Sequence, residues 1–176
     1  MDIINLLNDK SKKSVTKRAE ISETIRIGAV TIQDIKSHSD VLDDKKLALV
    51  FEAMESVTAK NPELADLEWL VFVQEFITSE SNNLKREASR IVGNIAFLFP
   101  DDLEVAIQKL LENTGNDGTV VRWSSAYALG RIIAIPKYAG SELFGVVSDL
   151  YECEKDNGIK NQYLSGLKKA QKISKG

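Results

Sequence analysis

The chain has 176 residues, 43% hydrophobic and 28% charged, which is the composition of a soluble globular domain with a sizeable core. A net charge of −3 gives no global attraction to nucleic acid, and one cysteine excludes an internal disulfide and a zinc site built on cysteine pairs. Because no apolar run approaches the roughly 20 residues of a membrane span, and the N-terminus lacks signal-peptide features, we expect a cytoplasmic protein that does not enter a membrane.

Few prolines and a low share of aromatic residues favour helices over strands along the chain. The first part, about residues 2–38, is predicted to form N-terminal capping helices with a basic linker, Lys10–Lys13, between the first two. In the second of these helices, Ile21, Ile25 and Gly28 are expected to be buried. The three capping helices are expected over residues 2–8, 15–29 and 31–38.

From residue 43 onwards, hydrophobic residues recur at the spacing of a helix face, and turn signals separate the segments. We therefore expect pairs made of an inner and an outer helix. Thr119 is the predicted N-cap of an inner helix that Pro136 ends. The last outer helix is expected to bury Val146, Val147 and Leu150. The inner helices are expected over residues 43–59, 84–99, 119–135 and 159–173, and the outer helices over 64–78, 101–113 and 141–154.

The segment Asp117–Pro136 contains a pattern that the other inner helices repeat. Its helix is expected to bury one face, and equivalent faces recur at steps of 37 or 38 residues. A proline also follows three of these helices. A fixed period of this size predicts a solenoid of stacked helical pairs. The equivalent faces are Val50, Ala53, Met54 and Val57; Ala88, Ile91, Val92 and Ile95; Ser125, Ala128, Leu129 and Ile132; and Tyr163, Gly166, Leu167 and Ala170.

The segment VVRWSSAYALGRI, Val120–Ile132, resembles the second helix of a HEAT repeat, and is closest to the HEAT-like type named after phycobilisome lyases. LKREASRIVGNIA, Leu84–Ala96, is a looser match, and the resemblance covers about residues 43–173. It implies an all-α protein whose fold is a right-handed α-α superhelix of about four helical pairs plus N-terminal helices. One domain would then span residues 1–176, with the inner helices lining its concave side.

Three basic residues, Lys85, Arg122 and Lys160, occupy equivalent positions near the starts of successive inner helices. In HEAT-like repeats, the matching basic residue often bonds to an acidic side chain in the loop of a neighbouring repeat. The resemblance therefore implies a structural ladder, with Asp117 as the candidate partner of Arg122. Contact with a ligand is the alternative role.

The residue types that usually carry catalysis are sparse. His38 lies in a polar segment, and we interpret it as solvated rather than catalytic or metal-binding. Cys153 lies between two glutamates, which weaken a thiol as a nucleophile. The pairs 43–44 and 101–102 are both Asp-Asp at predicted helix starts, where capping explains them better than acid–base chemistry. We therefore expect no enzyme activity, no metal and no cofactor.

A column of polar and aromatic side chains lies opposite the buried face of the inner helices. On a concave side, its arginines would offer forked donors, and its aromatic rings rigid contact area, to an acidic partner. Alternatively, the aromatic residues belong to the core between repeats and the arginines form a solvated face. The column consists of Arg86, Arg90 and Asn94, then Trp123, Tyr127 and Arg131, then Asn161, Ser165 and Lys169.

Two functions from different classes follow. The first is a non-catalytic scaffold that binds a protein partner, acidic in character, on the concave face near Arg90, Trp123, Tyr127 and Arg131. The second is nucleic-acid binding, because some HEAT-like proteins are DNA alkylation repair glycosylases with a concave basic surface. The net charge of −3 disfavours this second function, and no matching catalytic aspartate is found. The lyase-type pattern also implies chromophore attachment or handling as a third function.

Overall fold

The computed structural model describes residues 3–175, in which helices account for all the regular secondary structure. The all-α prediction is therefore confirmed over this range. Asp2, which was assigned to the first capping helix, lies outside the described residues. The α-helices are α1 (Ile3–Asn8), α2 (Ser14–Arg26), α3 (Ile32–Ser39), α4 (Asp44–Thr58), α5 (Leu67–Gln74), α6 (Asn82–Ile95), α7 (Glu104–Asn113), α8 (Thr119–Ile133), α9 (Glu142–Cys153) and α10 (Asn157–Ser174), and the 3-10 helices are η1 (Pro62–Leu64) and η2 (Ala96–Leu98).

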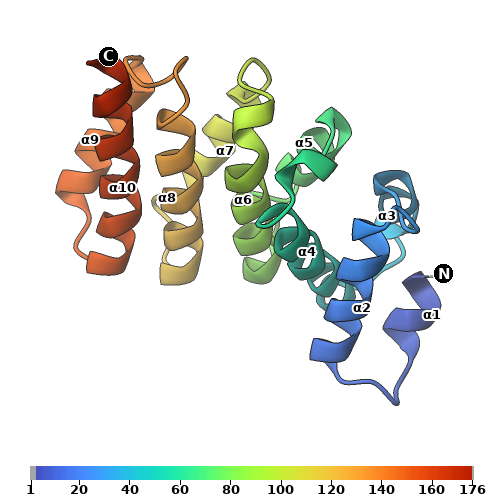
Figure 1. The fold of residues 1–176 in the computed structure, drawn as a ribbon. Helices are drawn as coiled ribbons and strands as arrows, with labels where there is room; N and C mark the ends of the chain where they lie inside the picture. The colour runs from blue at the N-terminus through green and yellow to red at the C-terminus, as the bar shows by residue number, and fades with distance from the viewer. Residues whose placement is uncertain (1–2, 176) are drawn as a thin grey trace.

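The even-numbered helices form a row in which each contacts the next, from α2 through α4, α6 and α8 to α10. The odd-numbered helices α5, α7 and α9 lie along one side of this row (Figure 1), and each contacts the even-numbered helix that follows it. The two ends of the chain lie at opposite ends of the row (Figure 1). Each even-numbered helix from α4 to α8 is thus enclosed by two neighbours in the row and by the second layer.

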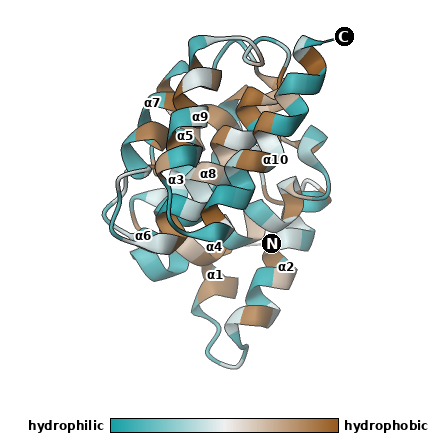
Figure 2. Ribbon diagram, turned by 90° about the vertical axis from the view of Figure 1, so that its left-hand side faces the viewer, coloured by the Kyte–Doolittle hydropathy of each residue, from teal (hydrophilic) through white to brown (hydrophobic). Residues whose placement is uncertain are grey.

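The buried faces of the even-numbered helices are the ones that the sequence pattern predicted. Ser125, Ala128, Leu129 and Ile132 of α8 are all 0% exposed, and the equivalent residues of α4, α6 and α10 are buried as well. Hydrophobic and hydrophilic segments alternate along the helices (Figure 2), as expected for helices that bury one face. The spacing of apolar residues therefore decides which side of each helix faces the core.

Glycines allow α8 and α10 to come very close. A Cβ on Gly130 would lie 2.6 Å from the carbonyl oxygen of Gln162, and a Cβ on Gly166 would overlap the backbone of Gly130. On α6, a Cβ on Gly93 would lie 3.0 Å from the Cα of Ala128 and 3.0 Å from the ring of Tyr127, both on the facing helix α8. At these crossings, the absence of a side chain permits contact between backbones.

Helix starts follow the capping expectation at some positions and depart from it at others. Asp43 caps α4, because its carboxylate accepts a hydrogen bond of 2.9 Å from the backbone N–H of Lys46. The Asp101–Asp102 pair does not cap α7, whose N-cap is Leu103; Asp101 instead pairs with Lys137 at 2.8 Å. Thr119 is the first residue of α8 rather than its N-cap.

The prediction that Gly28 is buried in the second helix is wrong. The helix ends at Arg26, and Gly28 is exposed with φ +73°. The backbone N–H groups of Ala29 and Val30 both donate to the carbonyl of Thr24, which closes the end of the helix. A glycine in this conformation terminates a helix, so Gly28 is a stop signal and not part of the buried face.

The last outer helix, α9, is less buried than expected. Val147 is buried, but Val146 is 42% exposed and Leu150 is only partly covered. The reason is its place at the end of its layer, where the described chain adds no further helix beyond it. No described helix has both the length and the hydropathy needed to cross a membrane.

Candidate functional site

One face of the row of even-numbered helices carries most of the side chains that the sequence singled out, together with Phe97. We call it the row face, and define it by Arg86, Arg90 and Phe97 on the α6–η2 segment, Trp123, Tyr127 and Arg131 of α8, and Ser165 and Lys169 of α10. These residues alternate with the buried positions of the same helices, so helical geometry turns them away from the core. The row face is polar and charged near α4 and α6, and hollowed near α8 and α10.

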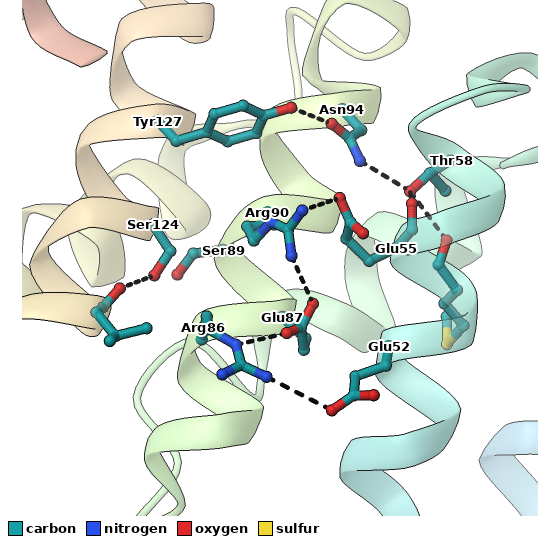
Figure 3. Close-up of polar contacts among 12 residues, drawn as sticks. Glu52, Glu55, Thr58, Arg86, Glu87, Ser89, Arg90, Asn94, Ser124 and Tyr127 are labelled. Atoms are coloured by element: carbon teal, nitrogen blue, oxygen red, sulfur yellow. Dashed lines mark hydrogen bonds and ion pairs between the residues drawn. The ribbon is translucent and has the colours of Figure 1, made fainter. Parts of the chain in front are cut away.

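The arginines of α6 are held by glutamates. Arg86 contacts Glu87 at 2.5 Å and Glu52 at 3.5 Å, and Arg90 contacts Glu55 at 2.8 Å and Glu87 at 3.4 Å (Figure 3). Arg18 of α2 also reaches Glu52, at 3.5 Å. Three arginines and three glutamates therefore neutralise one another, and they tie α2, α4 and α6 together.

Glu87 lies at the centre of this network and is 2% exposed. Burial raises the pKa of its carboxyl above the ordinary value, while the hydrogen bond from Arg86 and the charges of Arg86 and Arg90 act in the opposite direction. A buried carboxylate without these partners would be very costly. The two arginines therefore stabilise the core-facing charge of Glu87, which limits what they can offer to a ligand.

A chain of neutral hydrogen bonds continues the network towards α8. The hydroxyl of Tyr127 donates to the Asn94 side chain at 2.6 Å, and the Asn94 amide donates to the hydroxyl of Thr58 at 3.2 Å (Figure 3). Thr58 in turn donates to the carbonyl of Met54. Asn94 is 3% exposed, so this residue links three helices and has little surface for direct contact with a partner.

The aromatic residues of α8 form a stack on the row face. The rings of Trp123 and Tyr127 lie 5.6 Å apart at 15°, and the guanidinium of Arg131 lies 4.5 Å from the centre of the Tyr127 ring. Partial burial raises the pKa of Tyr127, so its phenol remains a neutral donor. Arg131 is exposed, and no acidic side chain of residues 3–175 lies within ion-pair distance of it.

A cavity of about 510 Å³ opens next to this stack, between α8 and α10. Gly93, Gly130 and Gly166 line it without side chains, and the Cβ that each lacks would meet neighbouring backbone or ring atoms. Phe97 and Tyr127 supply aromatic surface, and Arg131 and Lys169 supply positive charge. No acidic residue lines the cavity.

The residue at the position of Gly93 and Gly130 differs along the row. Gly93 and Gly130 are equivalent, 37 residues apart, and the position 38 residues before Gly93 is Glu55. On α4, the glutamate at this position pairs with Arg90. The position that is glycine on α6 and α8, beside the cavity, is thus a charged and paired residue on α4.

The three basic residues of the expected ladder lie in three different environments. Arg122 donates to the carbonyls of Asn116 and Asp117 and lies 3.4 Å from Glu154, in the loop before α10. The acidic side chain near it is therefore Glu154, and Asp117 contributes its backbone. Lys160 lies 4.7 Å from the ring centre of Tyr151, whereas Lys85 has no ion pair within the described chain.

The remaining chemical candidates lie apart from the row-face cavity. His38 is partly buried on α3, with Nδ1 2.7 Å from the carbonyl of Asp34, and Cys153 is exposed at the end of α9. Asp43 and Asp101 are engaged by Lys46 and Lys137. Across residues 3–175, no group of three or more His, Cys, Asp or Glu side chains is placed to hold a metal ion.

Several residues of the site were not singled out from the sequence. Glu52, Glu55 and Glu87 pair with the arginines, yet glutamates on helices are common, and nothing local marks these three. Phe97, in the 3-10 helix that follows α6, is 55% exposed, and no sequence pattern singled it out. The sequence feature that accompanies the cavity is the recurrence of glycine at Gly93 and Gly130.

Comparisons with known proteins support the fold class. The chain is similar to the crystal structure of an engineered protein determined by the Northeast Structural Genomics Consortium, with 13% identity, 98% of each chain covered and a TM-score of 0.55. At this identity, the likeness shows the fold alone. No protein family matches the chain, and no curated protein does. The fold thus defines an all-α protein of packed helices, and the function has to be argued from the row face.

Proposed function

We propose that the chain is one continuous HEAT-like domain, a right-handed superhelix of helical pairs, that acts as a non-catalytic scaffold for a protein partner. The recurring buried faces and the row of even-numbered helices support the repeat architecture. In such an array the row face is the inner, concave surface. The partner binds on it around Trp123, Tyr127 and Arg131.

The observation that carries this proposal is that Arg131, at one end of the row face, has no ion-pair partner among the described residues. Near α4 and α6 the arginines already have glutamate partners, but Arg131 is exposed over the Tyr127 ring beside a cavity. Aromatic residues and arginine are the residue types that dominate binding energy at protein interfaces. Arg86, Arg90 and Asn94 act in this proposal as the support of the site and not as its contact surface.

The test is a pull-down from lysate of the native cell with three baits: wild type, Trp123→Ala/Arg131→Ala, and Tyr151→Ala/Lys160→Ala. The control also removes an aromatic–cation pair, but on the α9 side of the molecule. We expect a protein that is captured by wild type and control and lost with the row-face variant. Circular dichroism verifies that all three are folded. Equal capture by all baits would contradict a binding site on the row face.

Nucleic-acid binding remains the alternative, because α10 carries four lysines and no acidic residue. Against it, Glu52, Glu55 and Glu87 already neutralise the arginines of α6, so the row face over α4 and α6 offers these cations to no phosphate backbone. Fluorescence anisotropy with duplex DNA at several salt concentrations separates the two functions. Tight binding with a steep salt dependence would favour nucleic-acid binding as the function, whereas weak binding would favour the protein scaffold.

A further inference from the structure

The cavity between α8 and α10 differs from the rest of the molecule in charge. Its rim has Arg131 and Lys169, both exposed and without an ion pair in residues 3–175, and none of its lining residues is acidic. The helix that forms one wall, α10, adds Lys168 and Lys172 and contains no Asp or Glu. A chain with a net charge of −3 therefore concentrates positive charge at this end.

The cavity also offers apolar surface. Phe97 is 55% exposed at its edge, and its glycine floor presents backbone and Cα atoms. Ile135 and Pro136 complete one wall. A volume of about 510 Å³ falls in the range of about 300–1,000 Å³ that is common for binding pockets. An exposed aromatic ring beside two unpaired cations favours a ligand that is apolar at one end and negatively charged at the other.

We propose that the cavity between α8 and α10 binds an acidic peptide segment of the partner, with an aromatic side chain inserted between Phe97 and Gly166 and flanking carboxylates on Arg131 and Lys169. This inference rests on the proposed scaffold function and names the chemistry of its partner. Arg131 binds a carboxylate through its forked donors, and Lys169 acts as a point charge on the opposite rim.

Charge distribution favours a short peptide over a nucleic acid. On the row face, the uncompensated cations lie on α8 and α10, while the part over α4 and α6 is occupied by paired charges that include Glu52 and Glu55. A phosphate backbone that extended along the row would meet arginines there that are already paired. A peptide of a few residues fits within the two helices where positive charge is free.

The test uses the full chain labelled with ¹⁵N and follows glycine amide signals by NMR. The probe is the peptide N-acetyl-Glu-Phe-Glu-amide, and the comparison peptides are the Lys-Phe-Lys and Glu-Ala-Glu analogues. We expect saturable shifts of Gly93, Gly130 and Gly166 with the probe, and much smaller shifts with either analogue. Gly115 and Gly145 lie outside the cavity lining and serve as internal references.

Two variants give a matched comparison. Lys169→Glu reverses a charge on the rim of the cavity, and Lys168→Glu makes the same change on the neighbouring exposed residue, which does not line it. We expect Lys169→Glu to weaken peptide binding at least about tenfold and Lys168→Glu by less than about threefold, since close opposite charges contribute more than distant ones. Equal effects would overturn the proposal, because they would indicate non-specific attraction to α10.

Three other outcomes would also overturn it: no saturable shift with the probe, equal shifts with the basic peptide, or larger shifts of the same glycines with a single-stranded oligonucleotide. The scaffold function is judged separately. A partner that is lost with Trp123→Ala/Arg131→Ala but retained with Lys169→Glu would keep the scaffold and reject the peptide cavity.

Discussion

At the scale of single residues, the burial of the Glu87 carboxylate opposes its pairing with Arg86 and Arg90. Its carboxylate is almost completely buried, yet it accepts from Arg86 and lies near Arg90, which are each about one-third exposed. Surface ion pairs contribute little, about 0–1 kcal/mol, but these arginines offset the desolvation of a buried charge. Removing either one would leave Glu87 underpaired, a more costly change than losing an exposed salt bridge.

The pKa of Glu87 gives a prediction for Glu87→Gln. Folding raises this pKa above its ordinary 4.5, so the protonated form is favoured in the folded state. The contribution of this group to the free energy of unfolding is therefore present below pH 4.5 and is lost as the pH rises through the raised value. The variant lacks this contribution.

We therefore expect the free energy of unfolding of wild type, minus that of Glu87→Gln, to decrease between about pH 4 and pH 7. Urea unfolding at a series of pH values measures the difference, and the subtraction cancels the other carboxyl groups. A difference that grows with pH would mean that the two arginines outweigh burial and lower the pKa.

At the scale of helices, the buried face of α8 and its contact with α10 hold the C-terminal part together. Leu129 is 0% exposed, at the centre of the face that recurs in the other even-numbered helices. Gly130 lies one residue further on, at the crossing where the two backbones meet. The packing of α8 thus requires a large side chain at Leu129 and the absence of a side chain at Gly130.

Leu129→Ala tests the buried face. We expect it to lower the free energy of unfolding by about 2–5 kcal/mol, the range for truncating a buried leucine. Chemical unfolding followed by circular dichroism measures the change. A loss below about 0.5 kcal/mol is what a surface position gives, and it would contradict the assignment of this face to the core.

Gly130→Ala tests the crossing. Its new methyl group would lie 2.6 Å from the Gln162 carbonyl, so the helices must separate, and we expect a loss of about 1–3 kcal/mol. Gly145→Ala on α9 is the matched control, because a Cβ there has no neighbour within 4 Å. In an exposed helix interior, that change should stabilise by about 0.5–1 kcal/mol. The same sign for both variants would argue against close contact of α8 and α10.

At the scale of the whole molecule, stability is distributed along the row. Helices α6 and α8 each have an even-numbered neighbour on both sides, whereas α10 has one, and α1 and α9 lie at the margins. Where helices pack in a row, each is stabilised mainly by its neighbours. The cavity lies near one end, between α8, which has neighbours on both sides, and α10, which has one.

Hydrogen exchange should reveal how local stability varies along the row. We expect the slowest exchange in the amides of α6 and α8, intermediate exchange in α10, and the fastest in α1 and α9, since local opening costs less where fewer neighbours must separate. Mass spectrometry after timed exchange measures it. Uniform protection of all helices would show that the chain opens as a single cooperative unit.

The sequence by itself determined the helical class and the buried faces of α4, α6, α8 and α10, because the spacing of apolar residues is a local property. It also marked Tyr127 and Arg131, whose side chains do lie together on the row face. It did not reveal that Gly28 ends a helix, since a glycine at a helical phase is compatible with either role.

The tertiary structure decided which charges are already paired. Arg86 and Arg131 are similar in sequence terms, but only the packing of α4 against α6 brings Glu52 and Glu87 to the former. It also decided that a cavity lined by glycines of α6, α8 and α10 lies at one end of the row. Pairing and hollows both depend on distances between residues from different helices, and the periodicity of one helix contains no information about those distances.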